Sequence, residues 1–401
     1  TLVNGILCSR NARNLVKQLF GDKALFVPYI DPGYTLFKKL ESEILKYRAD
    51  FHSDPQIILL ENHGSFVSAD SADEVRKIYE EVLSAISNHI GSTDKIEVLP
   101  FNPVLCKALP ALRMLLSGDK SKVIRYRNNS LIAKYYQNQM EFHKISLPLT
   151  PDIIVYCKTR YLFIEQSSTP EKILESARTQ LPRFLNEYGY LPKVIVIKNA
   201  GILAVDDSVA SAEAVLDVYE DMIKISHYSA LCGGTKTLTP DQTEFIDKWE
   251  VENYRRKVSQ GAAKGNRLEQ KIAIVTGGAQ GFGAGIAEAL FRLNVNVVVA
   301  DLNKETGSKF VEQLNNPESR NKAMFIKTDV SDPESVKNLV DNTVGAFGGL
   351  DLMVSNAGVL RAGGLDEMDP ETFTLTTGIN YNGYFYCAKY SSEVMKIQNQ
   401  E

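Results

Sequence analysis

The chain has 401 residues, which is long enough for two or three domains. Its hydrophobic fraction of 44% and charged fraction of 23% are those of an ordinary globular protein, and a net charge of −4 implies no basic face for nucleic-acid binding. No apolar run reaches the length of a membrane span, and five scattered cysteines without a Cys-x-x-Cys pair predict reduced thiols in a cytoplasmic protein.

The first half of the chain contains a strand, a turn and a helix in close succession. The apolar run 57–60 predicts a buried strand that leads into the turn Asn62-His63-Gly64, and an amphipathic helix is expected at 73–86. His63 is therefore either a hydrogen-bonded turn residue or a metal ligand, because neutral imidazole is a preferred ligand of Zn²⁺.

A second segment follows the same pattern. In both segments, Pro, a polar residue and four apolar residues lead to a charged residue, Asn, one variable residue and Gly. The segments span 55–64 and 192–201, and each continues with Asp-Ser and a helix that contains Tyr-Glu. This similarity predicts an internal duplication, with chance similarity of two strand–turn–helix units as the alternative. Ala200 stands where the first segment has His63, so the second copy would lack a ligand there.

The first segment resembles the class II aldolase/adducin family, which places a zinc-binding His on an Asn-His-Gly turn after a buried strand. The resemblance implies that His63 is a zinc ligand in the complete protein. The family's other ligands lie in an earlier His-x-His-Pro segment, and residues 1–8 resemble the helix that follows that segment. Because a catalytic zinc site needs three protein ligands, we expect weak or no zinc binding by this chain. In such aldolases the zinc polarises a substrate carbonyl.

Between the two halves, residues 249–267 are charged at first and then rich in Gly, Ala and Ser, which indicates a flexible linker. Shortly before it, Thr239 and Pro240 predict the cap and first turn of a helix.

Beyond the linker, two apolar strands at 272–275 and 295–300 flank a glycine-rich turn and a helix, a pattern typical of nucleotide binding. Glycines let a pyrophosphate approach the backbone, and the N-terminus of the helix attracts its charge. Asp301 ends the second strand, where its carboxylate can bind the adenosine ribose and repel a 2′-phosphate, so NAD is favoured over NADP. The apolar residues at helical spacing, which we expect to face the sheet, are Ile286, Ala289, Leu290 and Leu293.

The spacing Thr-Gly-x-x-x-Gly-x-Gly at 276–283 resembles the short-chain dehydrogenase/reductase family. Later motifs extend the resemblance: Asp329 after a third strand at 323–327, an Asn-Ala-Gly turn at 356–358, and Asn380. The resemblance implies that Asp329 contacts the adenine and that Asn380 is the family's structural and catalytic Asn. The residues that it implies for cofactor binding are Thr276, Gly277, Gln280, Gly281, Phe282, Gly283, Asp301, Leu302, Asp329, Val330, Asn356, Ala357 and Gly358.

The same family needs a Ser and a Tyr-x-x-x-Lys after this Asn, because the Tyr transfers the proton and the Lys lowers its pKa. The tyrosines that follow Asn380 are Tyr381, Tyr384, Tyr386 and Tyr390, and none has Lys four positions later. We therefore expect NAD binding by this chain without completed hydride transfer.

With both resemblances, the chain resembles the bifunctional aldolase/short-chain dehydrogenases that break down deoxysugars in bacteria. These enzymes are of the rhamnulose-1-phosphate aldolase/lactaldehyde dehydrogenase type. They imply zinc-dependent cleavage of a ketose 1-phosphate and NAD-dependent oxidation of the lactaldehyde product. They also imply a small sugar phosphate or aldehyde as substrate and a homo-oligomer, with no nucleic acid or membrane as partner. One alternative is a short-chain dehydrogenase for another sugar or alcohol, with a non-catalytic adducin-like binding region. Another is a binding or scaffold protein.

The predicted fold class is α/β, with an aldolase-like region that contains a repeat, followed by a partial Rossmann domain with a doubly wound parallel sheet. The predicted parts are the C-terminal part of an aldolase/adducin-like domain at 1–95, a degenerate second repeat at 96–247, a linker at 248–268 and the N-terminal part of the dehydrogenase domain at 269–401.

Overall fold

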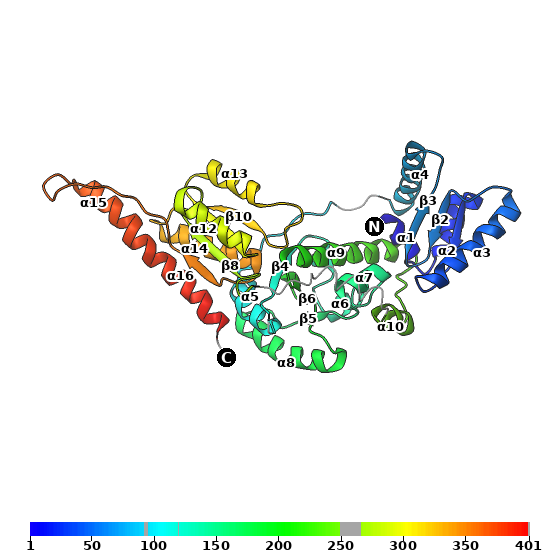
Figure 1. Ribbon diagram of the computed structural model, residues 1–401. Helices are drawn as coiled ribbons and strands as arrows, with labels where there is room; N and C mark the ends of the chain where they lie inside the picture. The colour runs from blue at the N-terminus through cyan, green and yellow to red at the C-terminus, as the bar shows by residue number, and fades with distance from the viewer. Residues whose placement is uncertain (92–94, 119, 249–265, 400–401) are drawn as a thin grey trace.

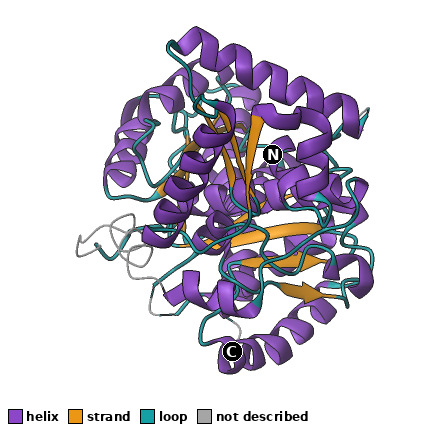
Figure 2. Cartoon of the chain, turned by 90° about the vertical axis from the view of Figure 1, so that its right-hand side faces the viewer, coloured by secondary structure: helices purple, strands orange, loops and turns teal. Residues whose placement is uncertain are grey.

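A computed structural model describes residues 1–91, 95–118, 120–248 and 266–399. Three α/β units follow one another in a row, from α3 at one end of the molecule to α15 and α16 at the other (Figure 1). Helices lie around the strands (Figure 2). Most of the predicted linker, residues 249–265, lies outside the described residues.

The strands are β1 (Ala24–Val27), β2 (Ile57–Leu60), β3 (Gly64–Val67), β4 (Val123–Arg127), β5 (Leu162–Ile164), β6 (Val194–Ile197), β7 (Gly201–Asp206), β8 (Ile272–Thr276), β9 (Asn296–Asp301), β10 (Ala323–Lys327) and β11 (Leu352–Val354). The α-helices are α1 (Leu2–Leu7), α2 (Ala12–Phe20), α3 (Tyr34–Phe51), α4 (Ala72–Ile90), α5 (Pro103–Leu116), α6 (Gln139–His143), α7 (Pro151–Cys157), α8 (Pro170–Tyr188), α9 (Val209–Leu231), α10 (Pro240–Lys248), α12 (Gly281–Arg292), α13 (Lys304–Leu314), α14 (Pro333–Phe347), α15 (Pro370–Thr377) and α16 (Gly383–Gln398). Short 3₁₀ turns lie at Gly21–Lys23 and Ile132–Lys134, and a π-helical turn lies at Gly378–Asn382.

The first unit is a small sheet in the order β1-β2-β3, with β1 parallel and β3 antiparallel to β2. The strand predicted at 57–60 is confirmed as β2, and the predicted helix as α4. Alternate residues of β2 face opposite sides: Leu59 packs with α1, α2 and α4, whereas Ile58 packs with α3.

The second unit has the same order of elements, strand–helix–strand–strand–helix, in β5, α8, β6, β7 and α9. β5 is parallel and β7 antiparallel to β6, as in the first unit, and β4 adds a further antiparallel strand beside β7. The turns between the paired strands are alike as well, since Asn62 and Asn199 both adopt a left-handed conformation, with φ of 52° and 54°. The two segments with similar sequences therefore share element order, strand pairing and turn conformation.

The third unit is a parallel sheet in the order β10-β9-β8-β11. Helices α12 and α13 cover one face of the sheet, and α14 covers the other. Alternate residues of β8 and β9 point to opposite faces and pack in two different apolar cores. The strands predicted at 272–275, 295–300 and 323–327 are confirmed.

The predicted apolar face of α12 is correct only at Leu290, which packs against the core on this side of the sheet. Ile286 and Leu293 are 37% and 42% exposed, whereas Gly283, Ala287 and Phe291 are buried. Gly283 and Ala287 are small, so the helix backbone can lie close to the sheet on the side where they stand. This side of the helix is therefore buried, although larger apolar residues lie elsewhere on it.

The second and third units share one continuous apolar core. Helix α5 packs against α8 of its own unit and against α14 and α16 of the third unit. The helix cap predicted at Thr239 is confirmed, since its hydroxyl accepts from the Gln242 N–H and its own N–H donates to the Gln242 side chain. None of the helices in the described part of the chain has the length and apolar character that a membrane span requires. All five cysteines are free thiols.

Candidate nucleotide-binding site

The glycine-rich turn between β8 and α12 depends on backbone conformations and close contacts that favour glycine. Gly277 and Gly281 have φ of 60° and 58°, in the left-handed region. A Cβ at Gly283 would lie 2.1 Å from the carbonyl oxygen of Gly277, so α12 begins directly against the turn. Open space surrounds the Cβ position of Gly281, which leaves the backbone accessible to a pyrophosphate at the N-terminus of the helix.

Thr276 and Asn356 hold this turn in place from two neighbouring strands. The buried Thr276 hydroxyl accepts the N–H groups of Asn356 and Ala357, at 3.0 and 3.1 Å. The Asn356 side-chain amide donates to the carbonyls of Thr276 and Gly277, at 3.0 and 3.2 Å. These four bonds fix the ends of β8 and β11 next to each other, so the turns that follow the two strands form one rigid edge.

Asp301 is the last residue of β9 and lies beside the same turn. One of its carboxylate oxygens accepts from the Ala279 N–H at 3.1 Å, and the other accepts from the Asn303 N–H at 3.0 Å. A carboxylate oxygen can accept more than one hydrogen bond, so the side chain can also bind a ribose hydroxyl. Its negative charge disfavours an additional phosphate at this position.

Asp329 and Val330 follow β10 at the same edge of the sheet. The Asp329 carboxylate accepts from the N–H and the hydroxyl of Ser331, at 2.9 and 2.6 Å, and forms a local turn. Val330 is buried against Gly383, where an added Cβ would lie 3.0 Å from its side chain. The Val330 contact joins this turn to the start of α16.

Asn380 lies in the π-helical turn between α15 and α16. Its side chain makes two bonds with the backbone of Val359, accepting from the N–H at 2.9 Å and donating to the carbonyl at 2.8 Å. An added Cβ at Gly358 would lie 3.2 Å from the Asn380 oxygen, so the Asn-Ala-Gly turn passes close to this side chain. Single π-helical turns occur frequently at functional sites.

The structure thus brings the sequence-predicted cofactor residues together at the carboxyl ends of β8, β9, β10 and β11. Ligands bind parallel α/β sheets at this end. The side chains of Phe282 and Leu302 are 90% and 57% exposed at this edge, and Gln280 is exposed as well.

His63 lies far along the chain from this edge, on the turn between β2 and β3, where it is partly buried. Its Nδ1 atom is buried without a hydrogen-bond partner, and burial lowers the pKa of the imidazole, opposed by the charge of Asp152. Neutral imidazole is the form that binds metals. However, no group of three His, Cys, Asp or Glu residues within the described ranges could hold a metal ion, so no complete zinc site accompanies His63.

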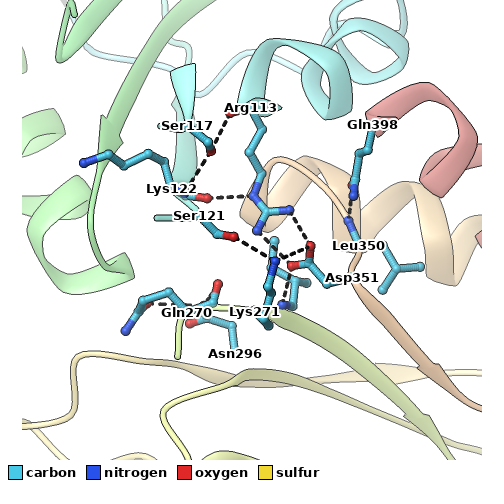
Figure 3. A network of polar contacts seen from close by, with 11 residues as sticks. Arg113, Ser117, Ser121, Lys122, Gln270, Lys271, Asn296, Leu350, Asp351 and Gln398 are labelled. Atoms are coloured by element: carbon cyan, nitrogen blue, oxygen red, sulfur yellow. Dashed lines mark hydrogen bonds and ion pairs between the residues drawn. The ribbon is translucent and has the colours of Figure 1, made fainter. Parts of the chain in front are cut away.

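A buried polar network that the sequence did not predict lies at the opposite end of this sheet, where β8 and β11 begin. The fully buried Arg113 of α5 donates to both carboxylate oxygens of Asp351, at 3.2 and 2.8 Å, and to the carbonyl of Lys122 (Figure 3). Asp351 also accepts from the Ile272 N–H at 2.8 Å, where β8 begins. The signal in the sequence is weak, because α5 contains two charged residues, Lys107 and Arg113, and only Arg113 is buried.

Residues 271–401 match the family model for short chain dehydrogenases. This part of the chain is similar to a short-chain dehydrogenase/reductase domain. Among curated proteins, the chain is similar to the uncharacterized oxidoreductase YuxG of Bacillus subtilis, at 23% identity over 98% of this chain and 61% of the relative. Its dehydrogenase part is similar to an uncharacterized oxidoreductase of Thermotoga maritima, at 39% identity over 32% of this chain and 49% of the relative.

Secoisolariciresinol dehydrogenase of Forsythia intermedia is 37% identical over 32% of this chain and 46% of that relative. A solved short-chain dehydrogenase/reductase of Burkholderia phymatum, in complex with NAD, is 29% identical over 34% of this chain and 47% of its own, with a TM-score of 0.32. The chain therefore spans 61% of YuxG and about half the length of the other curated relatives named.

Proposed function

We propose that residues 269–401 are the nicotinamide-binding part of an NAD-linked oxidoreductase that acts on a small sugar or other alcohol. The observation that carries the proposal is the carboxylate of Asp301 at the end of β9, hydrogen-bonded to the backbone beside the glycine-rich turn. An acidic residue at this place binds the adenosine ribose of NAD and repels the 2′-phosphate of NADP.

The surrounding residues fit a dinucleotide. The backbone at Gly281 and the start of α12 receive the pyrophosphate, and the turn held by Thr276 and Asn356 fixes their position. Asp329 is assigned to the adenine side. When bound, the nicotinamide supplies hydride transfer, and the chain's own residues contribute binding, orientation and the exclusion of water.

Asn380 is assigned the catalytic position that the sequence implies. It acts here by fixing the Asn-Ala-Gly turn through its two bonds with Val359. Because no Tyr-x-x-x-Lys follows Asn380 in this chain, we expect the 401 residues to bind NAD without turning over substrate. Activity, substrate and assembly into a homo-oligomer are proposed for a polypeptide that contains a complete dehydrogenase domain.

Isothermal titration of the 401-residue chain with NAD tests the binding proposal. We expect saturable binding with one site per chain, and its absence in the folded chain would contradict the assignment. For the substrate, a longer polypeptide with the complete dehydrogenase domain would be assayed with NAD against lactaldehyde, sugars and polyols. Oxidation of a sugar or polyol in preference to lactaldehyde supports the broader proposal, whereas preference for lactaldehyde supports the deoxysugar pathway.

A second candidate, zinc-dependent cleavage of a ketose 1-phosphate of the rhamnulose type, rests on His63. Its unpartnered, buried Nδ1 on the Asn-His-Gly turn is suited to a metal. The residues within the described ranges do not complete the site, so no catalytic step through zinc is derived. The alternative is a non-catalytic, adducin-like binding region. Tight, stoichiometric zinc in the purified 401-residue chain would contradict the expectation of weak binding, and lyase activity of a longer polypeptide would favour the aldolase.

A further inference from the structure

One edge of the first sheet is open, unlike its counterpart in the second unit. Strand β3 pairs with β2, and no strand in the described ranges pairs with its other edge. Strand β7 is enclosed between β6 and β4. The two strands correspond residue by residue, because Gly64 pairs with the last residue of β2 and Gly201 with the last residue of β6.

The side chains repeat this difference. Phe66 of β3 corresponds to Leu203 of β7, since each lies two residues after the paired glycine. Phe66 is 51% exposed, whereas Leu203 is fully buried. An exposed aromatic side chain on an open strand edge indicates a surface that another element covers.

The neighbouring helix is also uncovered. Helix α8 packs against α5 and buries four residues, whereas its counterpart α3 has no buried residue. Tyr34 and Phe37 of α3 are 74% and 56% exposed. In the second unit the missing layer is supplied by one continuous segment, α5 followed by β4.

We propose that the open edge of β3 and the adjoining face of α3 bind a helix–strand segment of the same polypeptide, located before residue 1 in a longer form of the protein. Its strand pairs antiparallel with β3, as β4 pairs with β7. In the second unit this segment ends at Arg127, 35 residues before Leu162 begins β5. In the first unit, 23 residues of this chain precede Ala24 at the start of β1.

The backbone groups that would make the new bonds can be identified. The Ser68 N–H donates to the carbonyl of Gln56 on the β2 side, at 3.0 Å. Because bonding alternates along an antiparallel strand, Ser65 and Val67 direct their N–H and C=O groups to the open edge. In the second unit, the Val205 N–H donates to the carbonyl of Lys193 on the β6 side. By the same alternation, Ile202 and Ala204 direct their N–H and C=O groups to β4.

Amide hydrogen exchange tests the proposal with an internal control. In the 401-residue chain, we expect Ser65 and Val67 to exchange at least about a hundredfold faster than Ile202 and Ala204. In a longer polypeptide that includes the preceding residues, all four amides should be comparably protected. Fast exchange of Ser65 and Val67 in the longer polypeptide would overturn the proposal. Protection in the 401-residue chain that rises with protein concentration would also overturn it, because a second copy would then cover the edge.

A substitution gives a second test. Phe66→Ser should leave the denaturation midpoint of the 401-residue chain nearly unchanged and lower that of the longer polypeptide. Leu203→Ser, at the enclosed counterpart, should lower the midpoint in both. Equal effects of Phe66→Ser in the two proteins would contradict a covering segment.

Discussion

At the residue scale, the approach of α12 to the glycine-rich turn leaves no room for a side chain at Gly283. Gly283→Ala would place a Cβ against the Gly277 carbonyl, and we expect a loss of about 1–3 kcal/mol in the free energy of unfolding, together with weakened NAD binding. Gly285→Ala in the same helix is the matched control. It meets open space and should stabilise the chain by up to about 1 kcal/mol. Urea denaturation and NAD titration measure both effects, and equal results for the two variants would refute the steric argument.

The burial of His63 makes stability depend on pH in a defined direction. Burial lowers the pKa of His63, so the unfolded state takes up a proton before the folded state as the pH falls. The His63 contribution is therefore fully present above its unfolded-state pKa of about 6.5 and is lost as the pH falls below that value. Urea denaturation at pH 7.5 and 5.5 should show a smaller decrease in stability for His63→Gln than for the parent chain. An unchanged decrease would show that other groups cause it.

At the element scale, the sequence predicted β2, β6, β8, β9 and β10, because runs of apolar residues and flanking turn signals are local properties. It did not predict β1, β3, β4, β5 and β7. It did not predict the buried face of α12, where close backbone approach depends on Gly283 and Ala287 rather than on the larger apolar residues. The partner of Arg113 could not be predicted either, since Asp351 lies 238 residues away in the chain. The residues at the carboxyl ends of β8, β9, β10 and β11, which we call the cofactor edge, could be predicted because a recognisable motif follows each of these strands.

The π-helical turn at Gly378–Asn382 provides a test of an element rather than a residue. Asn380→Ala removes both bonds to Val359, so we expect faster amide exchange at Val359 by at least about tenfold and weaker NAD binding. Asn382→Ala, at an exposed position in the same turn, is the control and should change neither property. Equal protection of Val359 in the Asn380 variant and the parent would show that the turn holds the loop without this side chain.

At the scale of the whole molecule, the second unit is fixed to the dehydrogenase sheet at the end opposite the cofactor edge. Arg113 and Asp351 join the units there, at the start of β8 and β11 (Figure 3). Removing one partner of a buried ion pair leaves an uncompensated charge, so Arg113→Met should lower the free energy of unfolding by about 3–5 kcal/mol. Arg292→Met breaks the exposed pair with Glu288 and should cost less than about 1 kcal/mol.

A double-mutant cycle with Asp351→Asn isolates the coupling between the two side chains. We expect the double variant to be more stable than the sum of the single losses predicts. Additive losses would show that the two groups act independently, and the network would then not be the link between the units.

The most direct test of the central claim, an NAD-binding edge governed by Asp301, is the ratio of NAD to NADP affinity measured by titration. For the parent chain we expect NAD to bind at least about tenfold more tightly, equivalent to about 1.4 kcal/mol. Asp301→Asn, which removes the charge and keeps the shape, should reduce that ratio towards one. Tighter binding of NADP by the parent chain, or an unchanged ratio in the variant, would contradict the account.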